Sequence, residues 1–371
     1  MTKSTDHSFI ARLTKPTQKS APKHISKLRE WLNALVFAVV MASLIRWSVL
    51  EAFTIPSSSM EQTLLTGDFI FVSKLHYGAR TPKTPLQIPL THQTIGSTDI
   101  PSYLDWVQLP HYRLPGFSCV KRGDNVVFNY PMELDKPIDL RTYYIKRCVA
   151  LPGDVLRMAN AQVYVNDVAQ PQYPGLQYCY YLKTTAILKD RFFKQYAIQE
   201  YFPVQAGYLV HTTPDTATRL EKIASIQEVC RRVMPQGVAD PQVYPSSVLF
   251  PWNADYFGPI TVPAKGITIP INAENLAQYE RVITCHEGHQ NVQIDNDQLW
   301  IDGREIKAYT FQQDYYFMMG DNRHNSEDTR FWSFVPQDHL VGKAVFVLFS
   351  LDASKQFLNK IRWRRMLQRV D

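Results

Sequence analysis

The chain has 371 residues, of which 45% are apolar and 20% are charged, so it can build a packed core and is not a wholly disordered protein. Its net charge is +6 at pH 7, with basic clusters in residues 1–30 and again between Lys355 and Arg369. An apolar segment follows the first of these clusters. We therefore interpret both basic ends as contacts for anionic lipid and expect no nucleic-acid partner.

The apolar segment follows the first basic cluster and covers residues 31–50. It carries one charge, Arg46 near its far end, and about 20 such residues are enough for a helix to cross a bilayer. The positive-inside rule then predicts residues 1–30 in the cytoplasm and the rest of the chain across the membrane. A cleavable signal peptide and a buried core helix are the alternatives, but the preceding basic region is long for a signal peptide.

Short runs rich in β-branched and aromatic residues come next. Residues 67–74 and 123–130 each open with Gly-Asp, and residues 143–158 contain a Leu-Pro-Gly-Asp turn. Short β-branched and aromatic runs that are bounded by such turns are typical of strands. We therefore expect an antiparallel β architecture, a mainly β fold, after the membrane helix.

Three further runs support the same fold. Residues 163–169 and 298–306 read as hairpins, the second around Asp-Gly, which is a strong hairpin signal. Residues 341–351 are apolar but interrupted by Lys343, which favours a strand over a second membrane span.

The stretch between residues 170 and 297 differs in composition and is rich in Pro, Tyr and polar residues. We interpret it as an inserted subdomain with a helix over 218–233. Residues 81–118 form a shorter segment between predicted strands, with many Pro and Thr. The expected division of the chain is 1–30 basic tail, 31–50 transmembrane helix, 51–169 first part of the β core, 170–297 insert, 298–350 second part of the core, and 351–371 basic C-terminal tail.

The chain has five Cys, an odd number for a compartment that could be oxidising, and a disulfide between Cys179 and Cys230 is one conceivable pairing. The run Cys285-His-Glu-Gly-His289 gathers three potential metal ligands, but it falls one residue short of the helical H-E-x-x-H zinc motif. We interpret it as a surface loop and expect no metal and no cofactor.

Serine chemistry is the best candidate activity, but the familiar serine-hydrolase signatures are missing. There is no G-x-S-x-G elbow, and no His lies in a segment that marks it as a triad base. A neutral amine can activate a serine instead, although an unperturbed lysine is only roughly 0.1% neutral at pH 7.4. Lys146 lies in an apolar β-run, where burial can lower its pKa.

Four segments then give the sequence a specific resemblance. Residues 55–74, 122–131, 143–154 and 319–336 resemble, in order, the sequence boxes of type I signal peptidases. These are membrane-bound Ser/Lys endopeptidases, and the apolar segment stands directly before the first box, as in the family. The resemblance implies the family's antiparallel β catalytic core, here with an inserted subdomain and one N-terminal transmembrane helix.

The resemblance also implies a role for individual residues. Ser59, before Met60, matches the nucleophile, and Lys146 matches its general base. Ser57 matches the hydroxyl that completes the oxyanion hole with the Ser59 N–H, and Ser326 matches the serine that orients the lysine. The pocket for the small residue before the cleaved bond would include Phe53, Ile55, Pro56 and Ile145, and a supporting ion-pair network would include Arg147, Asp321, Asp328 and Arg330.

Two positions depart from the family pattern. Ser58 stands where glycine is usual between the two serines of the first box, so three neighbouring hydroxyls compete for the nucleophile's role. Ser333 stands where glycine is usual after Trp332. Neither change removes a reactive group, so an active enzyme is still expected.

The function implied is removal of N-terminal signal peptides from exported preproteins, after small residues, on the extracytoplasmic side of a bacterial inner membrane. The implied partners are signal peptides, membrane lipids and the secretion translocon. A self-cleaving repressor-type Ser/Lys protease is a rival, but it would need a DNA-binding motif and no membrane span. An anchored scaffold without catalysis is the second rival, and it predicts that Ser59 and Lys146 are dispensable.

Overall fold

The computed structural model describes residues 27–96 and 98–370, and the basic tail expected over residues 1–30 therefore lies almost wholly outside the described residues. The chain divides into two compact units, with the boundary between Ala42 and Ser43. Helix α1 covers Lys27–Ser48 and none of its residues is buried. Within the described residues it is the one helix that is long and apolar enough to cross a membrane, and it contains most of the predicted span 31–50.

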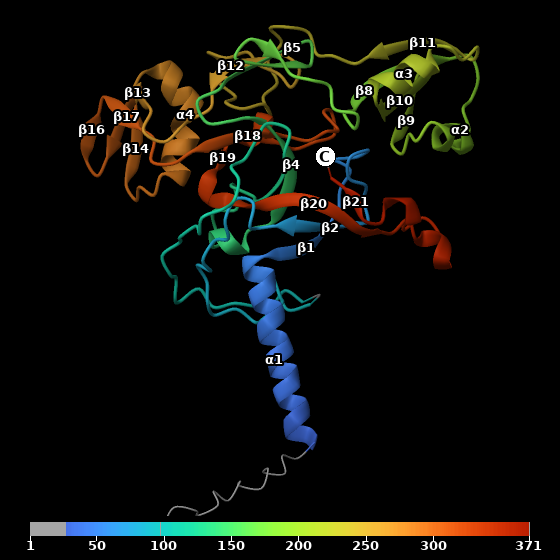
Figure 1. Cartoon of the computed structure of the whole chain (residues 1–371). Helices are drawn as coiled ribbons and strands as arrows, with labels where there is room; N and C mark the ends of the chain where they lie inside the picture. Colours follow the sequence, from blue (N-terminus) through green and yellow to red (C-terminus); the bar gives the residue numbers. More distant parts are fainter. Residues whose placement is uncertain (1–26, 97, 371) are drawn as a thin grey trace, which may run out of the picture. The chain divides into compact units, whose positions relative to one another are not determined.

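The second unit is built around an eight-stranded antiparallel sheet, which confirms the predicted architecture (Figure 1). Its strands run in the order β1-β2-β20-β3-β4-β18-β19, and β21 adds to β20. The bounds are β1 Leu50–Thr54, β2 Asp68–Ser73, β3 Asn125–Asn129, β4 Tyr143–Ala150, β18 Tyr315–Met319, β19 Val335–Pro336, β20 Leu340–Ser350 and β21 Gln368–Arg369. Strands from both ends of the sequence therefore meet in one sheet, and β4 lies between β3 and β18.

The Gly-Asp turns share one local structure. In each, the aspartate carboxylate accepts a hydrogen bond from the backbone N–H three residues earlier, at 2.8 Å for Asp68, 3.0 Å for Asp124 and 2.7 Å for Asp154. The preceding glycine has positive φ in all three turns, +88°, +91° and +84°, which costs glycine little. This pairing of residue types explains why β2, β3 and β5 each begin directly at or after a Gly-Asp pair.

A second, four-stranded sheet begins with β5, the strand that follows β4 in the chain. It has the order β12-β5-β6-β7, with β5 Val155–Ala159, β6 Gln162–Val165, β7 Val168–Ala169 and β12 Phe257–Thr261. The predicted hairpin over 163–169 is therefore present as the β6–β7 pair. Its apolar face packs with helix α4, Ala273–His286, and with residues of β18 in one core cluster.

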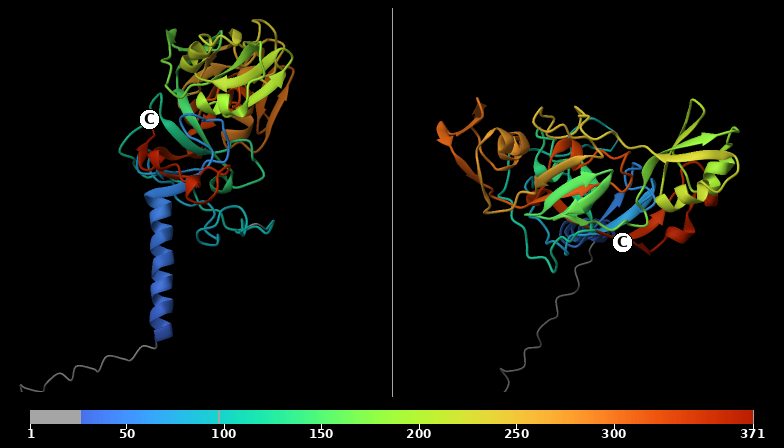
Figure 2. Two further views of the ribbon diagram at one scale, coloured as in Figure 1. Left: turned by 90° about the vertical axis from the view of Figure 1, so that its right-hand side faces the viewer. Right: turned by 90° about the horizontal axis from the view of Figure 1, so that it is seen from above.

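The remaining small strands extend this part of the fold. They are β13 Thr268–Pro270, paired with β17 Ala308–Thr310, and the three-stranded β14 Val292–Asp295, β15 Gln298–Ile301 and β16 Arg304–Ile306. The β15–β16 pair is the hairpin expected at the Asp-Gly dipeptide. Figure 2 shows these strands and α4 at one end of the second unit and the β8–β11 sheet at the other.

The β8–β11 sheet has its own core. It comprises β8 Tyr178–Thr184, β9 Tyr201–Val204, β10 Gly207–Thr212 and β11 Ile226–Arg231, with helices α2 Asp190–Gln195 and α3 Pro214–Leu220. The helix predicted over 218–233 is wrong for all but its first three residues. Helix α3 ends at Leu220, and Ile226 and Val229 lie instead in an edge strand paired with β8, where their β-branched side chains pack on the sheet.

Candidate active site

The nucleophile candidate lies on a loop that apolar residues fix to the sheet. The loop leaves β1 at Ile55, whose N–H donates to Asp68 O at 2.8 Å, and it returns to β2 at Gly67, whose N–H donates to Ile55 O at 2.9 Å. Met60 and Leu64 are buried in the same core cluster as Ile55. Because Met60 is buried directly after Ser59, the serine is held at the edge of the core.

Ser59 and Lys146 meet at this edge. The Lys146 Nζ lies 2.7 Å from the Ser59 Oγ, and the two residues are only 4% and 8% exposed. Lys146 is on β4, opposite Val126 of β3, so the sheet fixes where its side chain starts. The structure therefore brings together a serine hydroxyl and a buried amine that are 87 residues apart in sequence.

The environment of Lys146 weakens its hold on a proton. Burial lowers its pKa to about 8, against opposing effects from the carboxylates of Asp328 and Glu327. The Tyr144 ring, whose centre lies 5.3 Å from the Lys146 Nζ, acts in the opposite sense, because a ring face stabilises a cation. At pH 7.4 about a fifth of a lysine with this pKa is neutral, compared with roughly 0.1% for an unperturbed lysine. A neutral amine at hydrogen-bond distance from a hydroxyl is the arrangement that general-base activation of a serine needs.

Ser58, which left the choice of hydroxyl open in the sequence, is bound elsewhere. Its Oγ donates to Glu200 Oε1 at 2.6 Å and accepts from Asn325 Nδ2 at 3.0 Å. Asn325 also contacts the Glu200 carboxylate. Ser57 is exposed and lines the same cleft as Ser59. Of the three hydroxyls, only that of Ser59 is bonded to the lysine.

Ser326 lies beside the pair without a hydrogen bond to it. Its Oγ is buried and has no hydrogen-bond partner among the described residues, so the expected bond to Lys146 is not formed. The Lys146 amine donates to Ser59 instead. Ser326 is nevertheless beside the pair: a Cβ at Gly320 would collide with the Ser326 Oγ and also with the Ser59 carbonyl oxygen.

The four charged residues expected around the site form two buried ion pairs. Arg147 binds Asp321 with two hydrogen bonds of 2.8 and 2.7 Å, and Arg330 binds Asp328 with two of 2.8 Å. All four are at most 2% exposed. Asp328 also accepts from the Gly320 N–H at 3.0 Å, which ties the second pair to the segment beside Ser59.

Sequence reasoning missed the residues that hold the serine loop from the other side. The Asn322 N–H donates to Ser59 O at 3.0 Å, and its side chain donates to Ser58 O at 3.3 Å. His211 of β10 in turn contacts the Asn322 amide oxygen at 3.0 Å. Asn322 follows Gly-Asp in the fourth box, which was a signal for it, whereas nothing in the sequence marked His211 or Glu200.

A cleft of about 350 Å³ opens beside the pair. Ile55, Pro56 and Ile145 line it, as expected. Phe53 does not line it; its ring packs edge-on against Tyr143 with the ring centres 4.7 Å apart. The reason is the register of β1, which places Phe53 opposite Ile70 and against the apolar cluster. Ile55, Pro56 and Ile145 thus supply an apolar part of a cleft that polar residues also line.

The conceivable disulfide is not formed, and the prediction of a surface loop needs correction. Cys179 and Cys230 are both free thiols, because Cys230 lies opposite Tyr181 in the β8–β11 pair and not opposite Cys179. The run from Cys285 to His289 is not a surface loop throughout: Glu287 is buried and accepts hydrogen bonds from Tyr309 and Tyr315. Within the described residues, no group of His, Cys, Asp and Glu is placed to hold a metal ion.

Comparison with known proteins places the chain in a family. The family model described as "Signal peptidase, peptidase S26" matches residues 28–212 and 306–349. Signal peptidase I of Helicobacter pylori strain J99 is 24% identical over 378 residues, which cover 94% of this chain and 95% of the relative. Signal peptidase I of Buchnera aphidicola subsp. Schizaphis graminum is 26% identical, covering 86% and 75%. That of Rickettsia canadensis is 34% identical, covering 38% and 43%.

Proposed function

The chain belongs to the signal peptidase family, peptidase S26, and on this premise we propose that it is a type I signal peptidase with Ser59 as nucleophile and Lys146 as general base. It is a serine endopeptidase whose substrates are preproteins that carry N-terminal signal peptides. The observation that carries the residue assignment is the 2.7 Å contact between the Lys146 amine and the Ser59 hydroxyl in a buried setting.

The proposed reaction has two halves. Neutral Lys146 takes the Ser59 proton as the hydroxyl oxygen attacks the scissile carbonyl carbon, and the resulting ammonium then protonates the leaving amine. In the second half, Lys146 takes a proton from water as the water oxygen attacks the acyl carbon, and the ammonium then gives this proton to the Ser59 oxygen as its bond to the acyl carbon breaks. The same lysine acts as base and acid in turn, which suits a group with a pKa of about 8.

The oxyanion of each half is assigned to the Ser59 N–H and the Ser57 hydroxyl. Ser57 lines the cleft beside Ser59 and, unlike Ser58, has no protein partner among the described residues, so it is available to a substrate. A donor of this kind contributes about 3–4 kcal/mol to transition-state stabilisation in another serine protease. Ser326 is proposed to orient the neutral amine, since its unpartnered hydroxyl could donate to the nitrogen lone pair.

We also propose the membrane arrangement. Helix α1 would cross the inner membrane, with the N-terminus in the cytoplasm and the catalytic unit on the extracytoplasmic side, where lipids and the secretion translocon are its neighbours. The apolar, unburied surface of α1 supports the span, and the basic residues before it support the orientation. Residues 51–169 and 298–350 are proposed as the two parts of the catalytic core, since strands from both build the central sheet.

Complementation of a signal-peptidase-depleted bacterial strain tests this function. The wild-type gene should restore growth, whereas Ser59→Ala and Lys146→Met should not. Ser58→Ala is the matched control: it removes a neighbouring hydroxyl that does not contact the lysine, so it should keep the dyad and restore growth even with a partial loss of rate. Rescue by both dyad variants at wild-type levels would end the peptidase assignment. Rescue by Ser59→Ala together with loss of growth in Ser58→Ala would assign the nucleophile to Ser58 instead.

A further inference from the structure

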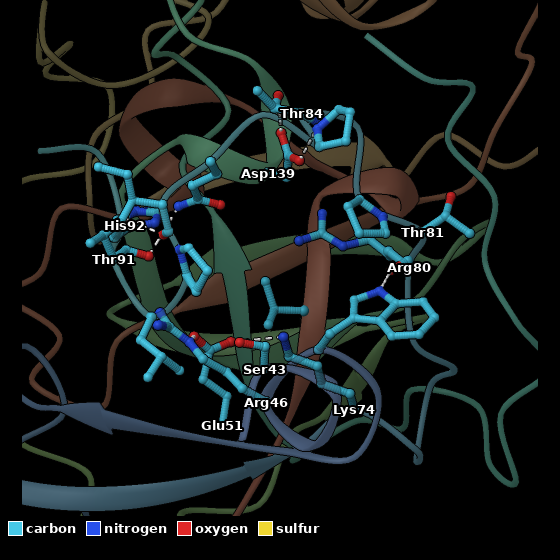
Figure 3. A pocket seen from close by; sticks show the side chains of 18 of the residues that line it. Ser43, Arg46, Glu51, Lys74, Arg80, Thr81, Thr84, Thr91, His92 and Asp139 are labelled. Carbon is cyan, nitrogen blue, oxygen red and sulfur yellow. Dashed lines mark hydrogen bonds and ion pairs between the residues drawn. The ribbon is translucent and has the colours of Figure 1, made fainter. Parts of the chain in front are cut away.

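A second pocket, of about 390 Å³, lies within the second unit beside the last turns of α1 (Figure 3). Ser43, Arg46 and Trp47 line it from the helix, and the segment from Arg80 to His92 supplies much of the remaining wall. The Trp47 indole N–H donates to Arg80 O at 2.6 Å, which fixes these two walls together. None of its lining residues belongs to the Ser59 cleft except Tyr143, which is shared.

The charges of this pocket are not balanced. It is lined by three cationic side chains, Arg46, Lys74 and Arg80, and by two carboxylates, Glu51 and Asp139. Glu51 is bound to Arg46 at 2.6 Å and to Lys74 at 2.7 Å, so one carboxylate serves two cations. Asp139 accepts instead from the backbone N–H groups of residues 83 and 84, both at 2.9 Å. One positive charge is therefore left over.

Arg80 is the cation without an acidic partner. Its guanidinium donates to Asp338 O at 2.7 Å and to Asn129 Oδ1 at 2.5 Å, which are a neutral carbonyl and a neutral amide. Within the described part of the chain, no carboxylate forms an ion pair with it. Burial lowers the pKa of Arg80 and that of Lys74, as expected for cations that have lost water without full compensation.

Polar atoms of the pocket also lack partners. The Ser43 hydroxyl, the His92 Nε2 and both ring nitrogens of His111 are shielded from solvent and make no hydrogen bond within the described residues. Figure 3 shows Arg80 and His92 entering the pocket from opposite sides. Unpaired polar groups around a cationic centre fit an oxyanion, and an arginine fork fits the oxygens of a phosphate in particular.

The rim of the pocket is apolar. Ile88, Leu90 and Leu109 line it and are each about half exposed, at 46%, 52% and 46%. An anion with an apolar tail would cover these side chains, whereas a free inorganic ion would leave them in water. The helix that supplies one wall is the proposed membrane anchor, so this rim would lie where phospholipid headgroups are found.

We propose that this pocket binds the phosphodiester group of an anionic glycerophospholipid, with Arg80 and Ser43 as donors to the phosphate oxygens and the apolar rim against the first carbons of the acyl chains. The proposal makes the extracytoplasmic leaflet a ligand of the catalytic unit as well as a support for its anchor. It rests on α1 as a membrane span and is independent of the Ser59–Lys146 chemistry.

Isothermal titration of the full-length protein in a neutral detergent tests the site. The probes are dihexanoylphosphatidylglycerol and inorganic phosphate. The lipid should bind saturably to one site, and phosphate at least about tenfold more weakly. Arg80→Gln should weaken lipid binding about tenfold or more, since hydrogen bonds to charged groups are the strong ones. Arg157→Gln, which changes an exposed arginine paired with Asp167, should not weaken it.

A second pair of variants decides the matter if Arg80→Gln does not fold. Leu90 is exposed and has φ +65°, a conformation that Asp and Asn tolerate better than most residues. Leu90→Asp and Leu90→Asn differ only in charge, and the Asp variant should bind the lipid about fivefold or more weakly at low salt. Equal affinities for this pair would overturn the anion site, and inorganic phosphate binding as tightly as the lipid would overturn the lipid as its source.

Discussion

The Ser58 hydroxyl donates a hydrogen bond of 2.6 Å to the carboxylate of Glu200, a residue 142 positions later in the chain. Glu200 lies between α2 and β9, at the edge of the β8–β11 sheet, so this contact links that sheet to the serine loop. Ser58 stands directly before Ser59, at a position where the resemblance led us to expect glycine. The flexibility that a glycine would bring to the loop is replaced by a fixed contact.

This contact predicts a kinetic role for Glu200 as a positioning residue. Glu200→Ala should lower kcat about tenfold with little change in KM, because a hydrogen bond to a charged group is worth about 1.5–3 kcal/mol and its loss lets the loop move. Ser58→Ala should have a similar effect, and the double variant should be no worse than either single one. Glu221→Ala, an exposed residue directly after α3, is the matched control. Additive losses would show that the two residues act separately.

The buried pair of Arg147 and Asp321 predicts a large effect on stability. Asp321→Asn should lower the free energy of unfolding by about 3–5 kcal/mol, because it leaves a buried guanidinium without its counter-charge. Asp167→Asn breaks the exposed pair with Arg157 and should cost less than about 1 kcal/mol. Urea unfolding followed by near-ultraviolet circular dichroism compares the two, and equal midpoints would contradict the structural role of the buried pair.

The cleft beside Ser59 predicts how specificity would change. Ile145→Ala should enlarge the cleft at its apolar wall. The ratio of the cleavage rate after Val or Leu to the rate after Ala should then rise by about tenfold or more. Val149→Ala is the control on the same strand, since Val149 packs in another core cluster and does not line the cleft. Peptides that differ only in the residue before the cut, separated by mass spectrometry, report the ratio. An unchanged ratio in Ile145→Ala would remove Ile145 from the pocket.

The local fold was largely predictable from the sequence, and the long-range contacts were not. Gly-Asp pairs and β-branched runs located β2, β3 and β20, because turn chemistry and strand propensity act over a few residues. The helix over 218–233 was wrong beyond Leu220 because pairing with β8 takes residues 226–231 into a strand. The missing bond of Ser326, the contact of Glu200 and the pocket at Arg80 depend on side chains brought together by the fold, and no spacing in the sequence encodes them.

The pH dependence of kcat/KM tests the central claim most directly, because only the neutral form of Lys146 can take the serine proton. With a pKa of about 8, the rate should rise about tenfold per pH unit below pH 7, bend near pH 8 and level off above it. Burial and Glu200 raise the pKa of Glu61 to about 7, so Glu61→Gln is measured alongside and should keep the rise through pH 8. A rate that is constant or falls between pH 6 and 9 in both proteins would contradict Lys146 as the base.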